Sequence, residues 1–203
     1  MSQLIIIPSL TEALPLIRSA GFTQTEDPIV YQKEDSGWKL LIAGIGTVPV
    51  IYNLTKHFAA NRYEKVIHSG IAGSYFLPLQ PGEVVQVIRD TFVDVGIDQP
   101  DEKPFRNGWM DVPEDRSLKL EAVSGITVDL VTAGPERKAR LADKFNPQIE
   151  SMEGAAVFYV CKMEDIPVIQ IRAISNYVGV RDRHSWKTEE AIEALTRVIS
   201  GLL

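Results

Sequence analysis

The chain has 203 residues, and 21 lysines and arginines stand against 27 aspartates and glutamates, which gives a formal net charge of −6. A length of this order predicts a single domain, residues 1–203, with a substantial core. Lysine and arginine gather in no stripe that could neutralise phosphates, so we expect no nucleic-acid partner.

The cysteine content and the apolar runs indicate where the protein works. Cys161 is the only cysteine, which rules out an internal disulfide and favours a reducing cytoplasm. Its apolar neighbours indicate a small buried side chain and not a nucleophile. The stretch MSQLIIIPS has no basic region, and no apolar run approaches the roughly 18 residues of a membrane span. We therefore expect a soluble, unexported protein with no membrane segment.

Short β-branched runs alternate with longer helical patterns along the chain. In chain order, the patterns predict strands at 4–7, 38–43, 65–68, 83–95, 126–131 and 167–175, and helices ending at 20 and covering 47–60, 136–145, 153–163 and 186–200. Such alternation predicts an α/β fold with helices flanking a parallel or mixed sheet. Residues 98–116 are rich in proline and acids, which predicts a long surface loop with exposed Phe105 and Trp109. This loop would serve as a lid or a subunit contact.

The residues that follow each strand are the candidates for chemistry, because open α/β sheets bind ligands beyond the carboxyl ends of their strands. After the first strand, PSLTEA (residues 8–13) places Glu12 near the start of a helix. Its carboxylate could activate a water molecule. Ser9 or Thr11 together with Glu12 is also a helix N-terminus signal, and on this segment alone capping is favoured.

Two further strand ends carry pairs of glycines that let the backbone approach a ligand. In AGIGTVP (43–49), a tight turn is an equal explanation, and Pro49 stands where a dinucleotide-binding fingerprint has its third glycine. In HSGIAGS (68–74), His68 alone is best explained as a satisfied core histidine. The chain has no phosphate-loop or zinc motif, and we expect the reaction to need no metal or organic cofactor.

Two polar residues near the ends of predicted elements need partners. In ESMEGAA (150–156), Glu153 opens a helix rich in small and apolar residues, where an unpaired carboxylate would be costly. Either backbone N–H groups at its own helix start or two neighbouring hydroxyls of a ligand would satisfy it. Asn176 ends the strand RAISN, and taken alone it favours an Asx turn.

Taken together, the glutamate after the first strand and the motifs GIG, SGIAG, SMEGAA and RAISN resemble the purine nucleoside phosphorylase and nucleosidase superfamily from end to end, with residues 98–125 matching least. The Met-Glu pair and the RAIS strand are similar to those of the hydrolytic 5′-methylthioadenosine/S-adenosylhomocysteine nucleosidases. The stretch SNYVGVRDRHSW most resembles the futalosine hydrolases. The resemblance implies a three-layer sandwich around a mixed central sheet, cleavage of an N-ribosidic bond, and a homodimer or higher homo-oligomer.

The resemblance also implies a role for each matching residue. Glu12 would activate the attacking water, Glu153 would bind the ribose 2′- and 3′-hydroxyls, and Met152 would pack against the sugar. The remaining substrate-binding positions that it implies are Gly70, Ala72, Gly73, Val131 and Thr132.

Asn176 departs from the adenosine-type nucleosidases, which have an aspartate at this position. A protonated aspartate can donate to purine N7 and accept from a 6-amino group, whereas an amide cannot serve as that acid. The NH₂ of Asn176 offers two donors, and a 6-oxopurine presents two acceptors, N7 and O6. The amide therefore predicts a 6-oxopurine such as hypoxanthine as the leaving group, and the resemblance predicts futalosine as the substrate, a step towards menaquinone.

Three alternatives stay open. A phosphorylase would need arginine and glycine-rich anion contacts near the first strand, where IIIPSLTEALP offers an acid and no arginine before Arg18. An adenosine-type nucleosidase would prefer methylthioadenosine, and a nucleoside-binding sensor would release no base.

Arg181 and Asp182 either close their loop by an ion pair, which is favoured, or bring Arg181 to the substrate.

Overall fold

The structure is a computed structural model that describes residues 2–34, 36–95, 108–179 and 186–203. The strands are β1 (Gln3–Ile7), β2 (Phe22–Gln24), β3 (Val30–Lys33), β4 (Trp38–Ile42), β5 (Lys65–Ser74), β6 (Val84–Asp90), β7 (Met110–Asp111), β8 (Glu121–Thr127), β9 (Ile149–Ser151) and β10 (Val168–Tyr177). The helices are α1 (Leu10–Ala20), α2 (Thr47–Ala60), α3 (Pro135–Phe145), α4 (Gly154–Met163), α5 (Thr188–Ser200) and a short 3₁₀ helix, η1 (Arg116–Leu118).

One mixed sheet contains every strand of the described residues, in the order β10-β6-β8-β9-β5-β1-β4-β3-β2, with β7 paired to β6. Strand β10 pairs with β5 as well as with β6, so five strands close on themselves while β1 to β4 extend as an open sheet. Strands β1, β4, β5 and β10 run parallel to one another, which brings their carboxyl ends to one side of the sheet.

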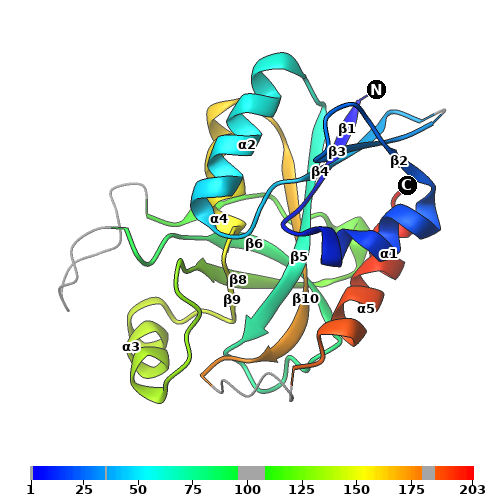
Figure 1. Ribbon diagram of the computed structural model, residues 1–203. Helices are drawn as coiled ribbons and strands as arrows, with labels where there is room; N and C mark the ends of the chain where they lie inside the picture. Colours follow the sequence, from blue (N-terminus) through cyan, green and yellow to red (C-terminus); the bar gives the residue numbers. More distant parts are fainter. Residues whose placement is uncertain (1, 35, 96–107, 180–185) are drawn as a thin grey trace.

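Helices cover both faces of the open part of the sheet, which gives three layers (Figure 1). Alternate residues of β1 point to opposite faces: Leu4 and Ile6 pack beneath α2 and α4, and Ile5 and Ile7 pack beneath α1 and α5. The expected three-layer α/β sandwich is therefore confirmed. Cys161, on α4, is buried in the first of these cores, and burial raises the pKa of its thiol to about 12.

Local signals explain where the helices begin and end. Ser9 caps α1 by accepting a hydrogen bond from the Glu12 N–H at 3.3 Å, and Gly21, with φ 72°, ends it in the left-handed conformation that glycine adopts readily. Helix α3 begins with Pro135, as the fixed φ of proline favours. In the part of the chain that the structure describes, no helix is long and apolar enough to cross a membrane.

Several predicted boundaries were wrong for identifiable reasons. The strand expected at 126–131 is β8, which ends at Thr127, and the apolar Leu130 and Val131 beyond it are 71% and 45% exposed. The strand expected at 65–68 continues to Ser74, because β10 pairs with its glycine-rich second half. Strands β2, β3 and β9 were not predicted, since three or four residues give too little alternation.

The loop expected at 98–116 is described only from residue 108, and Phe105 lies outside the described residues. Within the described part, Met110 is buried in β7, and Trp109 is partly covered. The Arg89 guanidinium lies 4.8 Å from the centre of the Trp109 ring, and Phe145 meets that ring edge-on. The expectation of an exposed Trp109 was therefore wrong, because an arginine and a helix from elsewhere in the chain cover the indole.

Candidate active site

A cavity of about 330 Å³ lies at the carboxyl ends of β5 and β10, the side of the sheet where α1 and α4 begin. Figure 1 shows these two strand ends beside each other. Every site residue predicted from the sequence lines the cavity except Gly70. The lining residues are Glu12, Ile45, Ile71, Ala72, Gly73, Val131, Thr132, Glu150, Ser151, Met152, Glu153, Ser175, Asn176, Val178 and Trp186.

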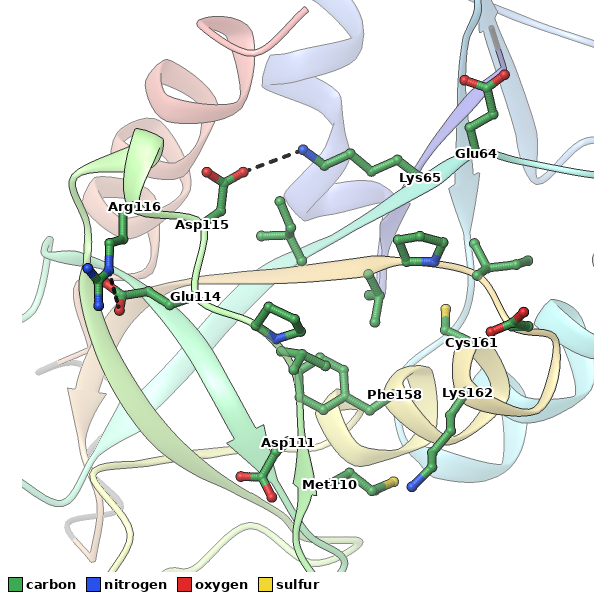
Figure 2. Close-up of a pocket in the computed structure, with 17 residues that line it drawn as sticks. Glu64, Lys65, Met110, Asp111, Glu114, Asp115, Arg116, Phe158, Cys161 and Lys162 are labelled. Atoms are coloured by element: carbon green, nitrogen blue, oxygen red, sulfur yellow. Dashed lines mark hydrogen bonds and ion pairs between the residues drawn. The ribbon is translucent and has the colours of Figure 1, made fainter.

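A larger cavity, of about 830 Å³, lies at the opposite ends of β5 and β10 (Figure 2). Four of the charged side chains that line it form ion pairs with one another, Lys65 with Asp115 at 3.6 Å and Arg116 with Glu114 at 3.4 Å. None of the predicted site residues lines it. We therefore assign the candidate active site to the smaller cavity, where the unusual polar residues converge.

Glu12 sits in the first turn of α1, where it both belongs to a helix start and faces the cavity. The Ser9 hydroxyl donates to Glu12 Oε1 at 2.6 Å, and the backbone N–H of Ile71 donates to Glu12 Oε2 at 3.1 Å. The two interpretations of PSLTEA are thus compatible, because Ser9 caps the helix while the Glu12 carboxylate is fixed against β5. A carboxylate held in this way at a cavity wall can act as a general base.

Glu153 is only 4% exposed and stands at the N-cap of α4, yet its side chain makes no capping bond to its own helix. The Gly46 N–H donates to Oε1 at 3.1 Å, and Arg172 Nη1 donates to Oε2 at 3.3 Å. Of the two partners considered from the sequence, the N–H groups of its own helix start are not used, and the GIG motif supplies a backbone donor instead. Burial raises the pKa of Glu153 and the nearby Glu12 charge adds to this, while Arg172 and the Gly46 N–H act to lower it.

Arg172, in β10, is the residue that sequence reasoning missed. It is fully buried, and Nη1 donates to the backbone oxygen of Ile71 at 3.3 Å as well as to Glu153. A Cβ atom on Gly70 would lie 2.5 Å from Arg172 Nη1 and 3.2 Å from Glu12 Oε2, so glycine leaves the room that the guanidinium occupies. The signal for its role was available, since an arginine inside an apolar strand needs a buried acid.

Asn176 lies near the end of β10, at a bulge where Gly73 of β5 is its neighbour. Its Oδ1 accepts a hydrogen bond from the Ser175 hydroxyl at 2.8 Å, and Nδ2 donates to the backbone oxygen of Tyr177 at 3.1 Å. Among the described residues, Nδ2 has this one acceptor, which leaves its second N–H for a ligand. The contact of Asn176 with the purine base stays a prediction, and in this structure one of the two N–H groups is engaged by the protein.

The opposite wall carries Met152, Val131 and Thr132, as predicted, together with Glu150, which was not. Glu150 Oε1 accepts from the Thr132 N–H at 2.9 Å, and Oε2 accepts from the Tyr75 hydroxyl at 2.9 Å. The first bond ties the loop after β8 to β9, and the second ties the residue that follows β5 to β9. No sequence pattern indicated this contact, because β9 itself was not predicted.

The remaining predictions concern residues near the cavity. His68 is fully buried and lies within hydrogen-bond distance of Gln170 and Arg172, which confirms the expectation of a satisfied core histidine. Trp186, part of the quoted SNYVGVRDRHSW motif, lines the cavity. Arg181 and Asp182 lie outside the described residues. The described residues form no cluster of three or more His, Cys, Asp and Glu side chains that could hold a metal ion.

Comparison with known proteins places the chain in a family. Residues 30–203 match the family model of the phosphorylase superfamily. The chain is 33% identical over 187 residues to a futalosine hydrolase of Thermus thermophilus, covering 83% of this chain and 82% of that relative. It is 32% identical over 162 residues to a 5′-methylthioadenosine/S-adenosylhomocysteine nucleosidase of Bacillus cereus, covering 69% of this chain and 68% of that relative.

The fold has a close match among solved structures. The structure of futalosine hydrolase from Helicobacter pylori superimposes with a TM-score of 0.87, covering 99% of this chain and 97% of that chain, at 21% sequence identity. The family model and the 33% identical relative show that the protein belongs to the phosphorylase superfamily, as its motifs predicted. Glu12 precedes the matched range, so its place in the site depends on the structure and not on the family model.

Proposed function

We propose that the chain is a nucleosidase that hydrolyses the N-ribosidic bond of a 6-oxopurine nucleoside. The substrate that its relatives support best is futalosine, which would yield hypoxanthine and dehypoxanthine futalosine on the way to menaquinone. The observation that carries this proposal is the convergence of Glu12, Glu153 and Asn176 on one cavity of about 330 Å³. Two carboxylates and an amide supply a base, a sugar contact and a contact to the purine.

The proposed reaction is a dissociative hydrolysis. The bond from the anomeric carbon to N9 breaks, the electron pair leaves with the purine, and the ribosyl ring acquires oxocarbenium character. Glu12 takes a proton from the attacking water as the water oxygen bonds to the anomeric carbon, and the released purine anion takes up a proton from solvent while Glu12 returns its own to solvent. The hydrogen bonds from Ser9 and Ile71 fix the Glu12 carboxylate, so the water approaches a base that is already oriented.

Glu153 is suited to the ribose 2′- and 3′-hydroxyls. Each of its carboxylate oxygens accepts one bond from the protein, from Gly46 or from Arg172, and retains capacity for one from a ligand. The Arg172 charge compensates the buried carboxylate in the absence of substrate. Hydrogen bonds to ribose would then need no rearrangement of the side chain.

Asn176 would distinguish the leaving group. Because Oδ1 and one N–H are engaged by Ser175 and Tyr177, the orientation of the amide is fixed and the second N–H would donate to the N7 and O6 edge of the base. A donor there stabilises the negative charge that gathers on the departing purine. A 6-amino group would instead point a donor at this N–H, and the resulting unpaired donors would disfavour binding of a 6-aminopurine by several kcal/mol in a buried site.

We infer that the protein acts as a homodimer or higher homo-oligomer with the site near the subunit boundary. Exposed apolar side chains support this inference: Ile45 at the cavity is 58% exposed, and Val48 and Tyr52 on α2 are 75% and 65% exposed. Such a patch beside a binding site is typical of an interaction surface. Sedimentation velocity at micromolar concentration tests it, and a fully active monomer would contradict it.

We further propose that residues 1–203 act as one domain in the cytoplasm. One sheet includes every strand of the described residues, and the thiol of Cys161 is free and buried. Both observations agree with a single folding unit in a reducing compartment.

The substrate proposal is tested by incubating the protein with futalosine, inosine and methylthioadenosine in parallel and separating the products by chromatography. We expect hypoxanthine from futalosine at the highest rate and the slowest turnover for methylthioadenosine. Faster release of adenine from methylthioadenosine would instead favour the activity named for the Bacillus cereus relative. Binding of nucleosides without release of any base would indicate a sensor.

A further inference from the structure

A line of fully buried polar side chains leads away from the candidate site through the sheet. It begins at Arg172, passes His68 on β5 and Gln170 on β10, and ends at Asp90 on β6. His68, Gln170 and Asp90 do not line the cavity. Side chains of this kind are costly to bury unless each donor meets an acceptor. The order of donors and acceptors along the line therefore determines which atom of each side chain carries a proton.

The donors along this line all point the same way. Arg172 Nη2 lies 3.1 Å from His68 Nε2, His68 Nδ1 lies 3.2 Å from Gln170 Oε1, and Gln170 Nε2 donates to Asp90 Oδ2 at 3.1 Å. Arg172 Nη2 also lies 3.4 Å from His68 Nδ1, so the guanidinium contact alone does not distinguish the two ring nitrogens. Gln170 distinguishes them: because its Nε2 donates to Asp90, its Oε1 faces His68 Nδ1 and must accept, which places the proton on Nδ1 and leaves Nε2 to accept from Arg172. Burial and the neighbouring Arg172 charge lower the pKa of His68 well below 6.5, which keeps the ring neutral.

The far end of the line is fixed by three donors around Asp90. Thr127 Oγ1 accepts from the Ala155 N–H at 2.7 Å, and its own hydroxyl proton goes to Asp90 Oδ1 at 2.9 Å. The backbone N–H of Thr91 also favours the charged carboxylate. With Gln170 on Oδ2, all three partners are donors, and a protonated carboxyl would leave its O–H without an acceptor among them.

We propose that Asp90, Gln170 and His68 are positioning residues for Glu153, which act by fixing His68 as the Nδ1–H tautomer so that its Nε2 accepts from Arg172. Arg172 is then oriented to donate to Glu153, the carboxylate assigned to the ribose hydroxyls. The part of this proposal that concerns substrate depends on the proposed nucleosidase function, whereas the tautomer of His68 does not.

The direction of the line gives a rescue experiment. In Asp90→Asn, one acceptor oxygen is replaced by an NH₂ group. Because Gln170, Thr127 and the Thr91 N–H all donate to position 90, the new NH₂ group meets a donor and is left without an acceptor. In the double variant Asp90→Asn/Gln170→Glu, the carboxylate moves by one position along the line. The new amide at position 90 would donate to the new carboxylate at position 170, and that carboxylate would also accept from His68 Nδ1–H. The amide oxygen at position 90 would still accept from Thr127.

Asp111→Asn is the matched control for these variants. It makes the same chemical change on the neighbouring strand β7, where the Asp111 side chain is 67% exposed. Because this side chain does not belong to the buried line, its substitution tests whether loss of an aspartate charge in this part of the sheet affects catalysis by itself.

Steady-state kinetics with the nucleoside turned over by the wild type measure the effect. Asp90→Asn should raise KM and lower kcat/KM about tenfold to a hundredfold, as expected when a buried donor loses its acceptor. The double variant should recover kcat/KM to within about threefold, and Asp111→Asn should not change it. A wild-type KM in a folded Asp90→Asn variant would overturn the proposal, as would a folded double variant no better than Asp90→Asn.

The ¹⁵N shifts of the His68 ring test the line without any assay of activity. We expect a neutral ring protonated on Nδ1 in the wild type and in the double variant, assigned by loss of the signals in His68→Asn. A wild-type ring protonated on Nε2 would overturn the proposal even if Asp90→Asn failed to fold. If the wild type turned over no nucleoside, the proposed function would fail while this measurement still decided the tautomer.

Discussion

Glu12 and Glu153 face the same cavity, but different contacts hold them. Glu12 accepts from a hydroxyl and a backbone N–H, whereas Glu153 accepts from a backbone N–H and from the buried charge of Arg172. Burial and Glu12 raise the pKa of Glu153, which is the arrangement expected when one carboxylate contacts substrate in a desolvated pocket. These contacts support the distinct roles proposed for two chemically similar side chains.

Glu12→Gln tests the assignment of the base. The amide oxygen can still accept from the Ile71 N–H, so the fold should be retained, while proton abstraction is lost. We expect kcat to fall by about 10² to 10⁴ with little change in nucleoside affinity. Stopped-assay kinetics and equilibrium binding measure the two quantities, and a kcat within about threefold of the wild type would exclude Glu12 as the base.

Asn176→Asp tests the selection of the leaving group. A carboxylate would face the Tyr177 backbone oxygen that Nδ2 now contacts, and it would offer no free N–H to O6. We expect kcat/KM for the 6-oxopurine nucleoside to fall about tenfold to a hundredfold, with the ratio shifting towards methylthioadenosine.

Asn176→Ser is the control for folding in this comparison. It removes the same two side-chain contacts, and we expect it to lower the free energy of unfolding by only about 1 kcal/mol. If Asn176→Asp hydrolysed the 6-oxopurine nucleoside as fast as the wild type, Asn176 would be a turn residue alone.

At the scale of elements, the site depends on how closely β5 and β10 approach. Their parallel pairing aligns Arg172 with Gly70 and Asn176 with Gly73. A Cβ on Gly73 would lie 2.9 Å from Val178 Cγ2 and 3.3 Å from Asn176 Nδ2. The two glycines of SGIAG therefore leave room for side chains from β10 and the residue that follows it. This packing explains the glycines in addition to the predicted backbone contacts with substrate.

Gly70→Ala tests this packing. The added methyl group would displace the Arg172 guanidinium and crowd Glu12, so we expect a loss of about 1 to 3 kcal/mol in the free energy of unfolding and a higher KM. Gly134→Ala is a suitable control, because a Cβ there meets no atom within 4 Å. Denaturant titration of both variants measures the difference, and equal stability would show that β5 yields to accommodate the methyl group.

The sequence predicted the helices and the motif residues well, and it failed where distant contacts decide the structure. Every helix that it predicted was found, because the helical patterns are long and the caps are local. The pair of Glu153 with Arg172 joins two elements and was missed, although each residue was in a quoted motif. The engagement of one Asn176 N–H by Tyr177 was also beyond prediction, since it depends on the bulge between β10 and β5.

At the scale of the whole molecule, the buried polar line makes stability depend on pH. Burial raises the pKa of Asp90 from 3.8 to about 6, against the opposing effects of Gln170, Thr127, Arg172 and the Thr91 N–H. Between these values the folded protein holds a proton that the unfolded chain has released. The contribution of Asp90 to the free energy of unfolding is therefore greatest below about pH 4 and falls as the pH rises to about 6.

Comparison with Asp90→Asn isolates this effect from the titration of other groups, because the variant lacks only the Asp90 carboxyl. The wild type should lose stability relative to the variant as the pH rises from about 4 to about 6, and the difference should then stay constant. Urea unfolding at several pH values gives both curves. A difference that is independent of pH would show that Asp90 titrates normally in the folded protein.

We propose that this member of the phosphorylase superfamily uses water, and not phosphate, to release a 6-oxopurine. The most direct test is the initial rate of hypoxanthine release from futalosine in phosphate-free buffer, repeated with added phosphate and with H₂¹⁸O. We predict release at the same rate with and without phosphate, with ¹⁸O incorporated at the anomeric carbon of the sugar product. Release that required phosphate and produced a sugar 1-phosphate would contradict the claim.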